Sequence, residues 1–393
     1  MNQSLLLHVV ERLETLVGKL PAGIQKPILH ELTPMKELFL QQRPPRLLFA
    51  GSNRTPVLEL LKMLFPEAVS DNVSSIATVN RWHDLQLTDR GTISILDARS
   101  TEENSDEIEE ELKRQAADLI FFIEGKDSGR KTPHKAAIKN LTLALQANER
   151  AKVAAKIIGL IEPSGKGNSA NEKRDSSMTD WRDELETALK SIGKMDERLV
   201  GVFYLPGPNT ERQATKMMSL VARELPNSAR IEMARISKDR AVQEDIAQIL
   251  VKSTTAVCTA IGAQPIPLAD LPILTTLQLV MVSGIMYVSG RERSMRAATE
   301  FIGALGANVG AGMLLREGTR AVLKFFPGWG NLICGMVAGA GTYAIGRAAT
   351  VFFVEGVTLK DARRTYLRSR KKSTRPQLLD DRPTRKPRKK DGK

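Results

Sequence analysis

The first half of the chain alternates short apolar runs with polar or amphipathic stretches. Each run is rich in β-branched or aromatic residues, which is typical of buried or half-buried β-strands. Strands that alternate with helices indicate a parallel or mostly parallel sheet with helices on both faces. After an opening strand that begins at Arg46, the predicted strands are Trp82–Leu87, Thr92–Leu96, Asp118–Glu124, Ala154–Ile161 and Arg198–Leu205, with helices at Glu102–Gln115 and Pro133–Glu149.

The region from Gln264 to Glu355 is apolar and rich in glycine and alanine. Small residues recur there at a four-residue spacing, which lets helix backbones approach closely. The predicted fold class is therefore α/β plus all-α: a mostly parallel sheet with flanking helices, then a tightly packed Gly/Ala-rich helical domain. The spaced pairs are Gly306/Gly310, Gly335/Gly339 and Ala344/Ala348.

Two stretches of this region are long enough to span a membrane, because Leu271–Gly290 has twenty residues without a charge and Phe325–Gly346 has twenty-two. Two spans would place Arg291–Lys324 outside the cell, although this segment carries an excess of arginine and lysine, which favour the cytoplasmic side. The charges therefore favour a buried helical bundle, or a hairpin that dips into one leaflet, over two true spans.

The positive charge of the chain gathers at one end. Of a formal net charge of +13, Gly356–Lys393 holds fifteen Lys and Arg against four Asp, a net +11. Residues 357–393 are predicted to form a basic, disordered tail, since charge and proline dominate them. Such a tail suits anionic lipid headgroups first and RNA phosphates second, and the remaining alternative is a solubilising tail without a specific partner. Tyr366 is the only aromatic residue of the tail, which argues against sequence-specific nucleic-acid binding.

One turn carries the candidate chemistry. Residues Arg46–Leu58 place a strand, a turn at Gly51 and a helix start in the order of a P-loop. The P-loop signature G-x-x-x-x-G-K-[ST] binds phosphates with backbone N–H groups and a lysine, and Mg²⁺ with a hydroxyl. The second glycine, the lysine and the serine are here Pro56, Val57 and Leu58, which remove an N–H, a charge and a metal ligand. The alternative is an ordinary buried strand followed by a turn.

With the strands and helices downstream, this turn resembles the G domain of Era-like GTPases over about Arg46–Leu225. The metal and γ-phosphate motif D-x-x-G reads DARS from Asp97 to Ser100, and the guanine-reading N-K-x-D position keeps only an acid, Glu162. The resemblance implies a GTPase scaffold that has lost the residues that touch nucleotide. Alternatively, an acid at the end of a buried strand is a helix or turn cap.

The apolar region resembles the helical domain of unknown function that accompanies Era-like GTPases in many bacteria, over about Ala241–Glu355. This second resemblance implies a G domain immediately upstream. The residues that carry it are Pro265, Pro267, Asp270 and Pro272, the run Leu314–Glu317, and the turn at Pro327, Gly328 and Gly330.

Apolar residues also follow helical spacing from Leu5 to Val17 and from Ile24 to Leu40. In related GTPases such N-terminal helices fold back onto the helical domain, which the resemblance implies here; an oligomerisation helix is the alternative. The predicted domains are thus N-terminal helices over 1–42, a degenerate G domain over 43–228, the helical domain over 229–356 and the tail over 357–393.

Two functions stay open. The first is a non-catalytic, GTPase-like scaffold or adaptor in the cytoplasm, peripheral to or partly inserted in the inner membrane, that binds a protein partner or a second copy of itself and needs no cofactor. The second is a switch with a rebuilt site for GTP and Mg²⁺, which uses Asp97, Arg54 and the hydroxyls of Ser52 and Thr55.

No catalytic or metal-binding constellation is predicted. The histidines show no ligand spacing, and Cys258 and Cys334 both fall in apolar helices, which fits a reducing cytoplasm. The candidate positions are those of a vestigial nucleotide site: Gly51, Ser52, Asn53, Arg54, Thr55, Pro56, Val57, Leu58, Asp97 and Glu162.

Overall fold

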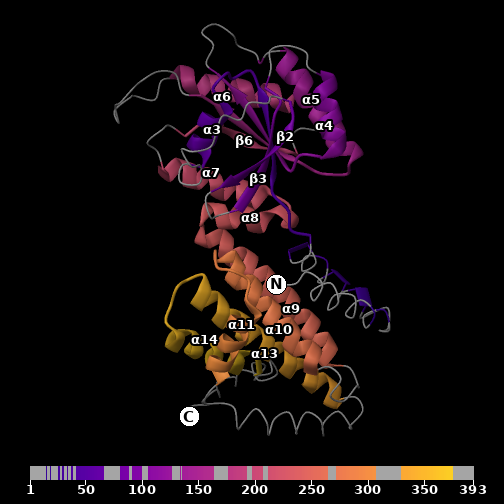
Figure 1. Cartoon of the computed structure of the whole chain (residues 1–393), viewed down its shortest axis with the longest axis vertical. Helices are drawn as coiled ribbons and strands as arrows, with labels where there is room; N and C mark the ends of the chain where they lie inside the picture. Colours follow the sequence, from indigo (N-terminus) through magenta and orange to yellow (C-terminus); the bar gives the residue numbers. More distant parts are fainter. Residues whose placement is uncertain are drawn as a thin grey trace, which may run out of the picture. The chain divides into compact units, whose positions relative to one another are not determined.

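The computed structural model describes residues 41–65, 80–87, 91–99, 105–125, 133, 135–162, 176–192, 197–206, 211–263, 271–306 and 329–374, with residues 15, 18, 25, 26, 29, 30, 33, 37 and 38. The chain divides into two compact units (Figure 1). The sheet unit comprises 36–246 and 287–292, and the helical unit comprises 1–35, 247–286 and 293–393. Most residues of the predicted N-terminal helices lie outside the described residues, as do Pro265, Pro267 and Asp270 of the proline-rich entry, the run Leu314–Glu317, and Pro327 and Gly328 of the predicted turn.

The sheet unit contains a six-stranded sheet in the order β2-β3-β1-β4-β5-β6. The first neighbouring pair, β2 and β3, is antiparallel, and the other pairs are parallel. This mostly parallel sheet confirms the prediction made from alternating strands and helices. Its strands are β1 (Arg46–Gly51), β2 (Trp82–Leu87), β3 (Gly91–Asp97), β4 (Leu119–Glu124), β5 (Lys156–Ile161) and β6 (Leu199–Tyr204).

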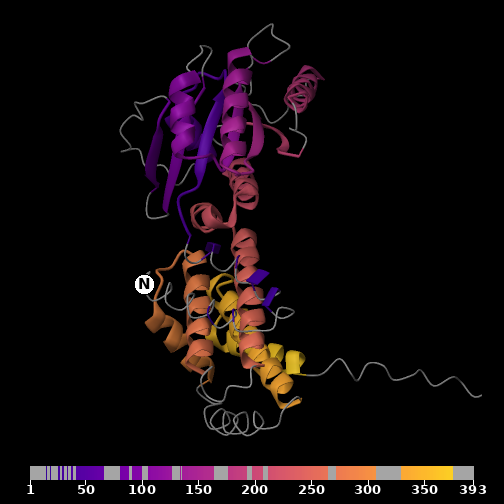
Figure 2. The same ribbon diagram turned by 90° about the vertical axis from the view of Figure 1, so that its right-hand side faces the viewer.

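Helices flank this sheet (Figure 2). Leu48 and Ala50 of β1 belong to a core that α4, α5 and α6 complete, whereas Phe49 points to the opposite face and stacks on Phe121 at 5.4 Å between ring centroids. The central strands β1 and β4 are buried on both faces of the sheet, which explains their continuous apolar runs. The helices of the unit are α3 (Val57–Leu64), α4 (Ser105–Arg114), α5 (Lys135–Arg150), α6 (Ser176–Lys190), α7 (Glu211–Glu224) and α8 (Asn227–Ser237).

The boundary between the units falls within helix α9 (Arg240–Gly262), between Ile246 and Ala247. The sequence placed it near residue 229 instead. The difference arises because α8 contacts β3 and so belongs to the sheet unit. The helical unit contains the rest of α9 with α10 (Leu271–Val288, up to Met286), α11 (Met295–Gly306), α13 (Trp329–Phe353) and α14 (Leu359–Thr374).

Small residues on α13 bring it close to α9, as their spacing predicts. A Cβ atom on Gly335 would lie 2.8 Å from the carbonyl oxygen of Thr259, and one on Gly339 would overlap the Thr259 hydroxyl. Real Cβ contacts are not this short, so both positions require glycine in the observed packing. At Gly306, by contrast, no described residue comes within 4 Å of an added Cβ, and its pair partner Gly310 lies outside the described residues.

Among the described residues, no helix is both long and apolar enough to cross a membrane. The polar residues that dilute the two apolar stretches are used inside the helical unit. The Gln278 amide donates to the hydroxyl of Thr342 at 2.9 Å, and Thr342, which is fully buried, donates in turn to the carbonyl of Ala338 at 3.0 Å. The first of these bonds joins α10 to α13, as in a packed helical bundle, and the second lies within α13.

The prediction of a disordered tail from residue 357 is wrong for its first part, because Leu359–Thr374 forms helix α14. Ala362 and Tyr366 are four residues apart and both buried, and α14 contacts α13 and α11. The Thr358 hydroxyl accepts the backbone N–H of Asp361 and donates to its carboxylate at 2.7 Å, a side-chain cap that starts the helix. Two buried positions and a cap are therefore enough to form a helix here, despite the charged composition of the segment. Residues 375–393 lie outside the described part of the chain.

Candidate functional site

The loop between β1 and α3 has the strand, turn and helix arrangement that the sequence predicts. Gly51 ends β1 with a φ of +116°, and a Cβ there would lie 2.7 Å from the backbone nitrogen of Ile123 on β4. Glycine is therefore required both by its left-handed backbone and by the neighbouring strand. Pro56 occupies the N-cap position of α3 without a side-chain cap, and the helix begins at Val57.

Backbone N–H groups of this loop are bonded within the protein. Ser52 N–H donates to Glu124 Oε1 at 3.2 Å, and Asn53 N–H donates to the carbonyl of Ile123 at 3.1 Å. Thr55 N–H donates to the Asn53 side-chain oxygen at 2.9 Å, as in an Asx turn, and Pro56 has no N–H. A phosphate cradle needs these donors to point at the ligand, whereas here the protein itself accepts them.

Glu124 supplies an anion to the loop from inside the protein. Glu124 is only 3 % exposed. Its carboxylate accepts hydrogen bonds from both the backbone N–H and the hydroxyl of Ser52. Sequence reasoning missed this residue, although it ends the buried strand β4 as Asp97 ends β3. An acid that closes an otherwise apolar strand is the sequence feature that could have identified it.

Glu162 follows β5 and reaches the same loop. Its carboxylate accepts a hydrogen bond from the side-chain amide of Asn53 at 2.6 Å. Each of its two oxygens also lies 3.3 Å from the Thr55 hydroxyl. Its backbone N–H donates to the carbonyl of Glu124 at 3.0 Å, which places the ends of β4 and β5 side by side. Glu162 thus holds the loop between β1 and α3 in place.

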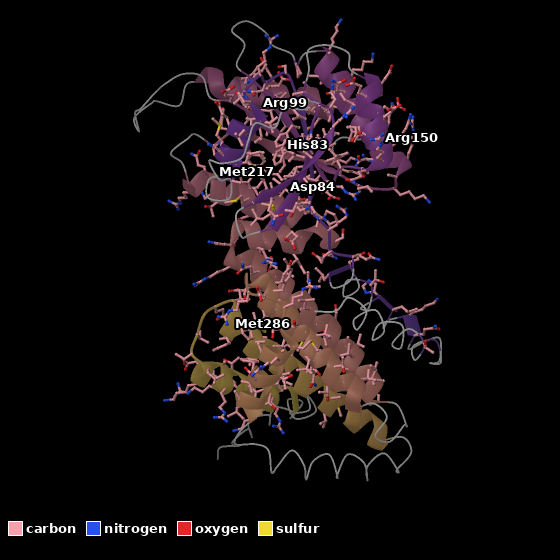
Figure 3. All side chains as sticks on the ribbon, in the orientation of Figure 1. His83, Asp84, Arg99, Arg150, Met217 and Met286 are labelled. Atoms are coloured by element: carbon pink, nitrogen blue, oxygen red, sulfur yellow. The ribbon has the colours of Figure 1, made fainter. Side chains whose placement is uncertain are left out.

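Arg99 supplies the cation of the site (labelled in Figure 3). Its guanidinium pairs with both oxygens of Asp97, at 2.8 and 3.0 Å, and donates to the loop carbonyls of Thr55 at 2.7 Å and of Asn53 at 3.2 Å. The side chains of Arg99 and Asp97 are 6 % and 12 % exposed. The predicted alternative cation, Arg54, is exposed instead. Asp97 also accepts the N–H of Arg99 at 3.2 Å, the capping role that an acid at a strand end was expected to have.

The structure therefore brings together five of the predicted positions and adds two. We call this set the loop network: Ser52, Asn53, Thr55, Asp97, Arg99, Glu124 and Glu162. Val57 is buried and Leu58 half-buried in α3, where Val57 contributes to the apolar side of the helix. Both residues serve packing in place of the phosphate and metal contacts of a P-loop.

The charges of the loop network do not suit a nucleotide. Three carboxylates face one guanidinium around the loop. A triphosphate would meet these carboxylates at short range in a partly buried site, where like charges repel strongly. Both oxygens of Asp97 already accept from Arg99, so Mg²⁺ would have to displace that pair. The described residues also contain no group of three His, Cys, Asp or Glu arranged to hold a metal ion. The residues present therefore do not fit GTP with Mg²⁺.

Neither a protein-family model nor a curated protein matches this chain.

Proposed function

We propose that the chain is a non-catalytic GTPase-like protein, a pseudo-GTPase, that acts as a scaffold or adaptor at or near an anionic membrane surface. The loop network carries the first part of this proposal. Carboxylates of the chain itself contact the β1–α3 loop, which in a P-loop would surround phosphates, and the loop donors at Ser52, Asn53 and Thr55 bond to acceptors within the chain.

The geometry also gives the domain a reason to keep this form without a nucleotide. In a GTPase, bound phosphates and Mg²⁺ order the loops at the carboxyl ends of the strands. Here, Arg99 bridges the end of β3 to the β1–α3 loop, and Glu162 bridges the end of β5 to it. A domain whose loops are ordered by its own side chains presents one constant surface to a partner, which suits a scaffold better than a switch.

The second candidate, a switch with a rebuilt GTP site, needs Asp97, Arg54 and the hydroxyls of Ser52 and Thr55 to bind the ligand. Ser52 donates its hydroxyl to Glu124, the Thr55 hydroxyl lies against Glu162, and Asp97 is paired with Arg99. Nucleotide binding would have to break these contacts, so it would be coupled to a large rearrangement of the loop.

Titration with fluorescent GTP and ATP analogues in the presence of Mg²⁺ separates the two functions. The proposal expects no saturable binding in the micromolar range to the wild-type protein or to Asp97→Ala. Micromolar binding by the wild-type protein that is lost in Asp97→Ala would refute the pseudo-GTPase and establish the switch. An active GTPase measured alongside confirms that the analogues bind under the same conditions.

The membrane part of the proposal rests on charge. Helix α14 alone carries seven Lys and Arg against one Asp, and the remaining basic residues follow this helix directly in the sequence. Flotation with liposomes that contain anionic lipid tests it, together with carbonate washing of cell membranes. The full chain is expected to float with anionic but not with neutral liposomes. A protein that ignores both would refute the membrane part and leave the nucleotide part standing.

A further inference from the structure

One side of helix α14 (labelled in Figure 1) is buried, and the opposite side is exposed. Ala362 and Tyr366 are buried where the helix packs on α13 and α11. Each residue of an α-helix is rotated by about 100° from the one before it. The residues on the opposite side of α14, about 160° around the helix axis from Ala362 and Tyr366, are exposed. They lie within an arc of about 100°, and we call them the α14 outer face: Lys360, Arg364, Leu367, Arg368 and Lys371.

The outer face combines four cations with one exposed apolar side chain. Arg364 is 69 % exposed and makes an i, i+3 ion pair with Asp361, which is itself 47 % exposed, so solvent screens the pair. Leu367 is 41 % exposed and lies on one edge of this arc, whereas Leu359, which is exposed to the same degree, lies outside the outer face, near the buried side of the helix. An exposed leucine gains nothing from contact with water, whereas on a helix that rests on a lipid surface Leu367 would be buried among the acyl chains.

Charge complementarity and the exposed Leu367 select the kind of partner. A row of lysine and arginine attracts any dense array of negative charge, and both lipid headgroups and RNA phosphates fulfil this condition. The outer face has no aromatic side chain on which a base could stack, and its leucine contributes nothing to phosphate contacts. An apolar residue among cations is instead the pattern of a helix that lies in a membrane interface.

We infer that the α14 outer face is a folded docking surface for anionic lipid headgroups, with Lys360, Arg364, Arg368 and Lys371 at the headgroups and Leu367 inserted at the edge of this row. This inference rests on the membrane part of the proposed function and assigns it to one helix face instead of to the basic residues after Thr374. It does not depend on the nucleotide part.

The test uses the full chain and vesicles of phosphatidylcholine with or without phosphatidylglycerol, in a flotation assay. Each cation near an anionic surface contributes about fivefold to binding at low salt, so neutralising four is expected to weaken binding by at least about tenfold after screening. Leu367→Gln is expected to weaken it about threefold. The neutralised variant is K360Q/R364Q/R368Q/K371Q, and its matched control removes four exposed cations from α5 and α7 of the sheet unit: K135Q/R212Q/K216Q/R223Q.

Two further variants address two questions. The first is whether binding needs arginine itself on the outer face, and the second is whether the residues after Thr374, and not the outer face, bind the vesicles. R364K/R368K keeps the charge and is expected to keep binding, because lipid headgroups do not require the planar guanidinium. Removal of residues 375–393 tests the remaining basic residues. Circular dichroism confirms that each variant keeps the helix content of the wild-type protein.

Three outcomes would overturn the inference. Binding that persists in the neutralised variant and disappears on removal of 375–393 would belong to that segment and would keep the membrane part of the proposed function. An equal loss of binding in the matched control and the neutralised variant would show an effect of net charge alone. Tighter binding to poly-uridine RNA than to the vesicles, lost in the neutralised variant, would identify RNA as the partner of this face. Binding that disappears selectively with the outer face supports the inference.

Discussion

The loop network and the α14 outer face use the same kinds of charged residue in opposite ways. In the loop network, Arg99 and Asp97 are almost completely buried and pair with each other, and the carboxylates of Glu124 and Glu162 accept donors of the loop. On the outer face, the cations point into solvent along a single arc of one helix. A charge satisfied inside the fold thus maintains its shape, whereas a row of exposed like charges is available to a partner.

Removal of the Arg99 guanidinium is expected to have the largest effect, because it would leave the buried Asp97 without its partner and two loop carbonyls without a donor. Arg99→Ala is predicted to lower the free energy of unfolding of the sheet unit by about 4 kcal/mol. Urea unfolding followed by tryptophan fluorescence measures it, since Trp82 and Trp181 belong to this unit.

Arg54→Ala is the matched control, because Arg54 belongs to the same loop and is exposed. Its predicted effect stays within about 0.5 kcal/mol. Equal effects of the two variants would mean that burial and pairing do not distinguish these arginines, and the contrast between buried and exposed charge would not hold.

The two faces of α14 give the next largest contrast. Tyr366→Ala removes a ring that is 5 % exposed, and it is predicted to destabilise the docking of α14 by about 3 kcal/mol. Leu367→Ala truncates a neighbour that is 41 % exposed, and its predicted cost is below about 0.5 kcal/mol. Amide hydrogen exchange in α14 reports both values, because undocking exposes these amides. Rapid exchange throughout α14 in the wild-type protein would contradict a packed helix.

The Cys258 thiol extends the contrast to a buried group that is neutral. Burial raises the pKa of this thiol from 9.0 to about 12, and a hydrogen bond with Thr342 only partly opposes the shift. The raised pKa favours the neutral thiol in the folded state. The stabilisation is complete below pH 9, where the thiol is neutral in both states, and is lost as pH rises toward 12, at about 1.4 kcal/mol per pH unit.

The measurement is the free energy of unfolding of the wild-type protein and of Cys258→Ala between about pH 8 and about pH 11, values chosen around the ordinary thiol pKa. The variant is expected to be less stable at about pH 8 and to lose stability less steeply above pH 9. Parallel curves would show that the thiol ionises as readily in the folded state as in the unfolded chain, contrary to its burial.

Local patterns were sufficient for much of the fold. The strands from β1 to β6 were predicted because each is a short run of β-branched and aromatic residues between turns, and the glycine of the β1–α3 loop was identified from its place after such a run. The spacing of Gly335 and Gly339 indicated a close helix contact, which the packing of α13 against Thr259 of α9 confirms. In α14, the Thr358 and Asp361 cap and the Ala362 and Tyr366 spacing were present in the sequence, but the composition of the tail obscured them.

The amino-acid sequence is enough to establish that the turn after β1 lacks the phosphate and metal ligands of a P-loop, because Pro56, Val57 and Leu58 can be identified without the folded structure. The groups that replace those ligands are visible only in the folded chain. Asn53 and Glu162 are separated by 109 positions, and Ser52 and Glu124 by 72. Such partners meet because parallel strands end at the same edge of the sheet, and a local pattern does not specify which strand ends are neighbours. The same limit applies to α14, whose outer face is defined only once α13 has covered the other.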